Sequence, residues 1–184
     1  MTKVNKQQVV DEALALLDEV GLDGFSTRRL AQRLGVEQPT LYWHFKRKED
    51  LLTAMAEAAL EPLGAIALPS PGDDWQQWFI ENYRSFRRIL LQHRDGARLH
   101  AGTFPNAEGF DRLSRKFAFL AESGLPEQDA RLAMLTASRF TIGSTLEEQS
   151  HPGAEVPDDA PAIDHDKAFE EGLRLLVDGL NRRH

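Results

Sequence analysis

The sequence contains no cysteine and no long uninterrupted apolar run. The absence of thiols among its 184 residues excludes disulfide scaffolds, thiolate nucleophiles, cysteine-ligated zinc and thiol redox switches. No stretch reaches the roughly eighteen consecutive apolar residues that a membrane-spanning helix needs. The first twenty residues interrupt their apolar side chains with Lys, Gln, Asp and Glu, and so lack a signal-peptide core. We therefore expect a cytoplasmic protein without a membrane partner.

The chain as a whole also lacks an excess of positive charge, but one segment has it. The formal net charge is −7, which argues against a general polyanion binder. Between Ser26 and Lys48, however, there is one acidic residue, Glu37, and six basic ones. These are Arg28, Arg29, Arg33, Lys46, Arg47 and Lys48. Such a run is either a solvated surface or a local binding patch on an acidic protein.

Strand-like alternation of apolar and polar residues is missing as well, and spacings of three and four dominate instead. This pattern predicts an all-α protein. We expect helices over residues 6–20, 27–34, 39–45, 48–63, 75–93, 97–100, 110–120, 127–148 and 169–180. Asn5 and Gln38 are the expected N-caps of the first and third helices. Three prolines, a glycine and several acids predict a loop over 151–166.

The basic segment has the spacing of a helix-turn-helix. Ala31 is small enough for a second helix to approach closely, and Gly35 permits the left-handed turn between the two helices. Leu41 and Phe45 anchor the inner face of the second helix. Its outer face then carries hydrogen-bonding or planar side chains, namely Gln38, Thr40, Tyr42, Trp43 and His44. These features predict a recognition helix.

Base edges in a major groove would meet the beginning of that helix. Arg28 is suited to a bidentate contact with guanine and Gln38 to one with adenine, whereas Thr27, Tyr42 and Lys48 are suited to phosphates. The alternative for Tyr42 and Trp43 is that both are core aromatics. Leu41 and Phe45 already fill the inward arc of so short a helix, which favours the outward placement.

The segment LAQRLGVEQPTLYWH at residues 30–44 resembles the tetracycline-repressor branch of the TetR family of transcriptional regulators. The resemblance continues through residues 91–97, 100–103, 140–143 and 146–149, and so covers most of the chain. It implies a TetR-like dimeric repressor of a palindromic operator in double-stranded DNA. An N-terminal helix-turn-helix domain over residues 1–47 and an effector-binding and dimerisation domain over 48–184 are expected.

The resemblance also implies the site residues. DNA contacts carry over onto Arg28, Gln38, Pro39, Thr40, Tyr42, Trp43 and Lys48, and Thr27 joins them as a predicted phosphate contact. The effector site carries over onto Asn82, Phe86, His100, Thr103, Phe104, Pro105 and Lys116. A magnesium ion bound with the effector would be held by His100, Thr103 and Glu147. One imidazole and two groups that hold its waters suit magnesium, which keeps much of its hydration.

Three positions depart from the family pattern. Gly64 stands where a drug-binding histidine is expected, Phe104 where an arginine is, and Lys116 where a glutamine is. Each change alters the polarity of the effector pocket. The resemblance implies a tetracycline-like magnesium chelate as the effector, whereas these three changes favour the alternative, a regulator with a degenerate pocket. Such a regulator is constitutive, or is controlled by a different ligand or a protein partner.

Two further points concern the last helix and catalysis. The apolar stripe from Phe169 to Leu180 gives the last helix a face to bury in a dimer, or alternatively in the core of its own chain.

An enzyme using a divalent metal is disfavoured, because the sequence has no HExxH motif and no glycine-rich phosphate loop. We expect a chain that is not an enzyme and needs no cofactor to bind DNA.

Overall fold

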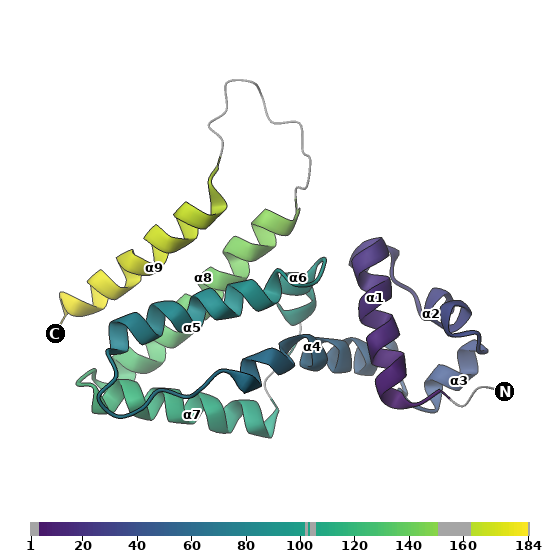
Figure 1. Ribbon diagram of the computed structural model, residues 1–184, viewed down its shortest axis with the longest axis horizontal. Helices are drawn as coiled ribbons and strands as arrows, with labels where there is room; N and C mark the ends of the chain where they lie inside the picture. Colours follow the sequence, from purple (N-terminus) through teal and green to yellow (C-terminus); the bar gives the residue numbers. More distant parts are fainter. Residues whose placement is uncertain (1–3, 102, 104–105, 151–162, 184) are drawn as a thin grey trace. The chain divides into compact units, whose positions relative to one another are not determined.

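The computed structural model describes residues 4–101, 103, 106–150 and 163–183 (Figure 1). In this part of the chain the regular structure is α-helical and no strand occurs, so the all-α prediction is confirmed. The helices are α1 (Lys6–Gly24), α2 (Thr27–Leu34), α3 (Gln38–Tyr42), α4 (Lys48–Ala65), α5 (Trp75–Leu90), α6 (Gly96–Ala101), α7 (Ala107–Glu122), α8 (Glu127–Ser150) and α9 (His165–Asn181). None of these helices is long and apolar enough to cross a bilayer.

The chain forms two compact units. The first comprises Met1–Pro62 together with Ile89–Thr103, and the second comprises Leu63–Arg88 together with Phe104–His184. Most of α4 and all of α6 therefore fold with the helix-turn-helix. The expected functional division at residues 47 and 48 stays a prediction. The expected loop over 151–166 lies mostly outside the described residues, up to residue 162.

Local sequence signals set the helix boundaries of the first unit. Asn5 caps α1 with a reciprocal capping box, in which its side chain accepts from Gln8 N and the Gln8 side chain accepts from Asn5 N. Gly35 closes α2 in the left-handed conformation, with φ of 64°, which glycine adopts at little cost. The N-cap of α3 is Glu37 and not Gln38, which is already the first helical residue. Pro39 occupies the first turn as expected.

The segment that carries α6 is bound to α1 within the first unit. The backbone N–H of Arg94 donates to the Asp18 carboxylate at 2.9 Å, and Leu22 N donates to Asp95 Oδ2 at 2.7 Å. Arg98 forms a two-bond ion pair with Asp23. Leu99 of α6 packs into the apolar core that α1, α2, α3 and α4 form. Movement of α6 is thus coupled to α1.

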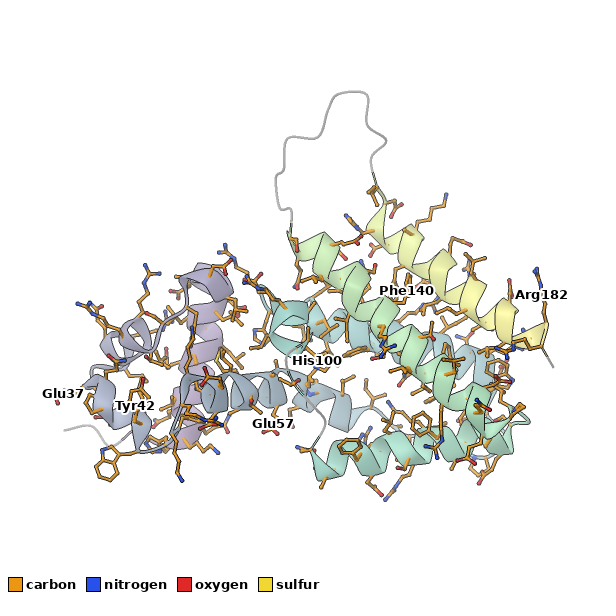
Figure 2. The ribbon with its side chains drawn as sticks, turned by 180° about the vertical axis from the view of Figure 1, so that it is seen from behind. Glu37, Tyr42, Glu57, His100, Phe140 and Arg182 are labelled. Atoms are coloured by element: carbon orange, nitrogen blue, oxygen red, sulfur yellow. The ribbon has the colours of Figure 1, made fainter. Side chains whose placement is uncertain are left out.

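The second unit is built on the packing of α7 against α8 and of α8 against α9. The ring of Phe140 on α8 stacks on Phe169 of α9 with centroids 5.4 Å apart; Phe140 is labelled in Figure 2. Tyr83 on α5 is buried and donates its hydroxyl hydrogen to Met134 O of α8 at 2.6 Å. These contacts tie α5, α8 and α9 into one core.

The apolar stripe of the last helix belongs to this core. Phe169, Leu173 and Leu180 are buried in their own chain, together with Val177. Between the two uses considered for this stripe, the structure selects the intramolecular one. The same helix leaves Leu175 72% exposed, and α8 leaves Leu132 and Leu135 about half exposed. These exposed leucines therefore lie outside the buried stripe of α9.

Candidate nucleic-acid interface and effector site

The helix-turn-helix is formed by α2 and α3, which pack on each other. Leu41 and Phe45 are buried in the core of the first unit, as the sequence predicts. The Gln38 Nε2 amide at the start of α3 donates to Thr27 Oγ1 at the start of α2, at 2.9 Å. Two predicted DNA contacts therefore hold each other at the junction of the two helices, while Pro39 beside them is exposed and Thr40 is half-buried.

The aromatic side chains at the end of α3 face solvent. Trp43 is 88% exposed and Tyr42 is 44% exposed; Tyr42 is labelled in Figure 2. The core alternative for these two residues is wrong, because Leu41 and Phe45 take the inward positions. His44 differs from the prediction, since its Nε2 lies 3.0 Å from Val4 O and its side chain turns back toward the core.

The six cations of the basic segment have different roles. Arg33 pairs with Glu12 and Glu19 of α1, and Arg47 pairs with Asp50. Both charges are compensated within the chain; the Arg33 pairs join α2 to α1, whereas the Arg47 pair is local to the start of α4. Arg28 and Lys48 are exposed and have no ion pair in the described residues. Arg29 and Lys46 are also exposed and form no ion pair in these residues. The predicted contacts Arg28 and Lys48 are therefore among the cations that no carboxylate of the described chain compensates.

The predicted effector residues of the second unit meet at one hydrogen bond. Lys116 Nζ on α7 donates to Asn82 Oδ1 on α5 at 2.7 Å. Asn82 is 9% exposed and Phe86, one turn further along α5, is 7% exposed. Gly64 is exposed, and a Cβ at that position would meet nothing within 4 Å. Phe104 and Pro105 lie outside the described residues.

A residue that the sequence reasoning missed, Arg112, lies one turn from Lys116 on α7. Its guanidinium donates to Leu63 O at 3.0 Å and to Ile66 O at 2.6 Å, at the end of α4. Basic side chains commonly satisfy the last carbonyls of a helix in this way. The sequence did offer a signal for Arg112, because residues four positions apart lie on the same face of a helix and Lys116 was already a predicted site residue. Burial and the repulsion from Arg112 lower the pKa of Lys116 to about 8.

The predicted metal ligands come from both compact units. His100 on α6 and Thr103 belong to the first, and the Thr103 hydroxyl donates to His100 O at 2.8 Å and lies 3.5 Å from His100 Nδ1. Burial lowers the pKa of His100, which favours the neutral imidazole that binds metals. His100, labelled in Figure 2, also lines a small cavity with Leu60 and Leu99. Glu147 lies exposed on α8 of the second unit.

The donor set therefore fits magnesium in chemistry, with one neutral imidazole, one hydroxyl and one carboxylate. Among the described residues no group of three His, Cys, Asp or Glu side chains is gathered within one metal site. Of the predicted set, only His100 and Glu147 belong to those residue types. The three-residue site stays a prediction.

Comparison with known proteins identifies both parts of the chain. Residues 9–55 match the family of bacterial regulatory proteins called the tetR family. Residues 68–163 match the family described as tetracyclin repressor-like, C-terminal domain. The first match covers α2 and α3, and the second covers α5 to α8.

Relatives match over nearly the whole chain. The tetracycline repressor protein class A from transposon 1721 of Escherichia coli is 46% identical, over 100% of this chain and 93% of that protein. SCO0253, a TetR-family transcriptional regulator from Streptomyces coelicolor, is 58% identical with a TM-score of 0.78, covering 100% and 98%. The structure of TetR class A in complex with 5a,6-anhydrotetracycline and magnesium is 45% identical with a TM-score of 0.81, covering 96% and 97%. This chain belongs to the TetR family of bacterial transcriptional regulators.

Proposed function

We propose that this chain is a dimeric repressor that binds a palindromic operator through α2 and α3 and releases it when a small-molecule effector binds. The observation that carries the proposal is the exposure of Trp43 and Tyr42 in a unit that also exposes Arg28 and Lys48, which form no ion pair in the described residues. Large apolar side chains that are exposed near basic groups indicate that the segment binds a partner, and is not only a solvated surface. Phosphates and base edges of duplex DNA satisfy both kinds of group.

The same surface has the dimensions that a major groove requires. A helix of five to eight residues is about 7 to 12 Å long, and the groove is about 12 Å wide. In a two-fold dimer, recognition helices about 34 to 36 Å apart would read two half-sites one turn apart. The exposed leucines of α8 and α9, Leu132, Leu135 and Leu175, are the surface that we assign to the dimer contact.

DNA binding is tested by selecting duplexes from a random pool with the full chain. We expect enrichment of a palindrome and a mobility shift on it, with affinity that falls steeply as salt increases. The double substitution Arg28→Ala with Trp43→Ala removes one cation and the most exposed aromatic, while the buried anchors Leu41 and Phe45 stay. This variant should fold and enrich nothing. If the wild type enriches no sequence, the proposal is wrong.

For the effector, we propose a small molecule bound together with Mg²⁺. The support is the fit of His100, Thr103 and Glu147 to magnesium, and the binding of 5a,6-anhydrotetracycline and magnesium by a relative that is 45% identical. Bound magnesium would supply a positive charge that polarises the chelating oxygens of the effector. His100 would contribute the direct imidazole ligand, and Thr103 and Glu147 would hold water molecules around the ion.

The expected test is a thermal-unfolding screen with a panel of tetracyclines, each with and without Mg²⁺. A binder should raise the unfolding midpoint and release operator DNA. His100→Ala should remove the dependence of that binding on Mg²⁺ while leaving operator binding intact. Dependence that survives the substitution unchanged would exclude His100 as a ligand.

Release requires that the effector favour a conformation with a different recognition-helix spacing. An effector with equal affinity for both conformations would shift nothing, and a coupling of about 1 to 3 kcal/mol is usual. We propose that α4 is the moving part; the resemblance also implies a rearrangement of the segment from Gly102 to Pro105, which apart from Thr103 lies outside the described residues. The bonds from Asp18 to Arg94 and from Asp23 to Arg98 then carry the motion of α6 to α1.

A second candidate is a DNA-binding regulator that no tetracycline controls. It is constitutive, or it responds to a different ligand or to a protein partner. The bond between Lys116 and Asn82 favours it, because Lys116 occupies the oxygen of a predicted ligand-binding amide. A selected operator that no tetracycline releases, with or without Mg²⁺, would support this candidate.

A further inference from the structure

Two cations on α7 have only uncharged partners in the described part of the chain. Arg112 donates to the backbone oxygens of Leu63 and Ile66, and Lys116 donates to the amide oxygen of Asn82. Arg115, on the outward side of the same helix, pairs instead with the Asp111 carboxylate at 2.9 Å. The carboxylate of Asp111 therefore compensates the exposed Arg115, and neither Arg112 nor Lys116 has such a partner in the described residues.

An ammonium group in such surroundings is costly. Lys116 is half-buried, and Asn82 against it is nearly inaccessible. A buried charge is normally balanced by an opposite charge, since hydrogen bonds to neutral groups replace only part of its hydration. Arg112 adds a like charge one helical turn away, and burial with this repulsion lowers the pKa of Lys116 to about 8. An anion would relieve both effects.

Spare donors and aromatic neighbours indicate what kind of anion fits. The ammonium of Lys116 has three N–H donors, of which Asn82 takes one, and the Asn82 amide nitrogen donates to nothing in the described residues. Asn82 lies between Trp78 and Phe86 at helical spacing along α5. Trp78 contacts Phe119 of α7 edge to face, with centroids 5.1 Å apart. Ionic donors between aromatic side chains suit an organic molecule with a flat apolar body.

We propose that the effector of this regulator is an aromatic organic anion, whose ionised oxygen is bound by Lys116 Nζ with Asn82 beside it. The inference rests on the proposed function, because it assigns the chemical class of the effector for that same site. A neutral ligand at this position would leave the ammonium uncompensated. Inorganic anions would not use the aromatic neighbours.

The test compares matched probes on the full-length chain. 2-Naphthoate and anthracene-9-carboxylate are titrated by calorimetry beside their primary amides, which have nearly the same shape without the charge. We expect each carboxylate to bind wild type at least tenfold more tightly than its amide. Lys116→Gln should abolish this preference, and Lys116→Arg, which keeps a positive charge, should retain most of it. Arg115→Gln is the control, since it removes a cation of the same helix that has its own carboxylate partner.

The inference is overturned if wild type shows no preference for the carboxylates, including the case in which neither probe of a pair binds. A preference that Lys116→Gln leaves unchanged also overturns it. The same preparations are assayed on the selected palindrome. Operator binding without a carboxylate preference refutes the inference and leaves the proposed repressor in place. If no duplex is bound, the proposed function itself fails.

Discussion

The bond between Gln38 and Thr27 sets the start of the recognition helix. Because both side chains are polar and lie where two helices meet, each fixes the rotamer of the other before any DNA arrives. Preorganisation of this kind lowers the ordering cost of binding. Trp43 and Tyr42 have no such restraint in the described residues and are solvent-exposed.

Replacing Gln38 with Ala should therefore affect specificity more than general affinity. We expect the loss of preference at one base pair of each half-site, worth about 1 to 3 kcal/mol, with non-specific binding nearly unchanged. Competition binding against all single-base variants of the selected operator measures this. Lys48→Ala is the contrasting variant, because loss of a phosphate contact should weaken binding to all sequences alike. A uniform loss with Gln38→Ala would refute its base-reading role.

The lowered pKa of Lys116 predicts how the free energy of unfolding changes with pH. Its pKa is about 8 in the native chain and about 10.4 when unfolded. Between these values the unfolded state binds more protons, so the contribution of Lys116 to the free energy of unfolding rises with pH. Relative to Lys116→Met, wild type should gain about 1 to 3 kcal/mol from pH 8 to pH 10.5. Urea unfolding at several pH values checks this.

The matching control for this titration is Arg115→Met. The guanidinium of Arg115 is exposed and stays charged throughout the range. The difference between wild type and this variant should not change with pH. A flat difference for Lys116→Met as well would place Lys116 in a solvated environment.

At the scale of helices, the contact between α8 and α9 depends on one small residue. A Cβ added at Gly172 would overlap the ring of Phe140, which itself stacks on Phe169. The close approach of these two helices therefore requires glycine at this position. The need is steric, because Gly172 is not among the glycines with positive φ.

Gly172→Ala should accordingly destabilise the second unit by about 1 to 3 kcal/mol, the usual cost of overpacking a core. Chemical unfolding followed by circular dichroism measures the loss. In a Phe140→Ala background the ring is gone, and the same glycine substitution should cost little or even stabilise the helix. Equal costs in the two backgrounds would mean that the ring is not the obstacle.

Helix positions were well predicted where the chain carries a local signal. Asn5, Gly35 and Pro39 act within one turn of their own position, so their effects can be read without knowing the fold. The predicted break after Val20 is confirmed, because Gly21 is non-helical, with φ of 68° and ψ of 174°. The short helical piece that follows it, up to Gly24, was not predicted; there Asp95 from a distant segment accepts from the Leu22 N–H.

At the scale of the whole molecule, assembly depends on the apolar surface that the fold leaves exposed. Leu175 on α9 and Leu132 and Leu135 on α8 are the exposed leucines that we assign to a second copy. Burial of such a surface in a two-fold contact would also set the spacing of the two recognition helices.

Leu175→Glu should convert the dimer to a monomer and abolish operator binding, without unfolding the chain, because the side chain is 72% exposed. Light scattering after gel filtration gives the mass, and circular dichroism checks the fold. Phe110→Glu, a similar change at an exposed residue of α7, should remain dimeric. A variant that stays dimeric would place the interface elsewhere, and a wild type that is monomeric would refute the proposed dimer.

Local signals and matching segments were enough to predict the helical class, the N-cap at Asn5, the turn at Gly35, the helix-turn-helix and the family, because each depends on neighbours in the chain or on a long stretch of matching residues. The apolar face that α9 buries, the direction of His44, and the bonds of Lys116 to Asn82 and of Arg112 to the end of α4 became known from the folded chain. These outcomes depend on residues that are tens of positions apart. Periodicity gives the faces of a helix, but only packing decides which face meets another helix, and which charge remains without a counter-charge.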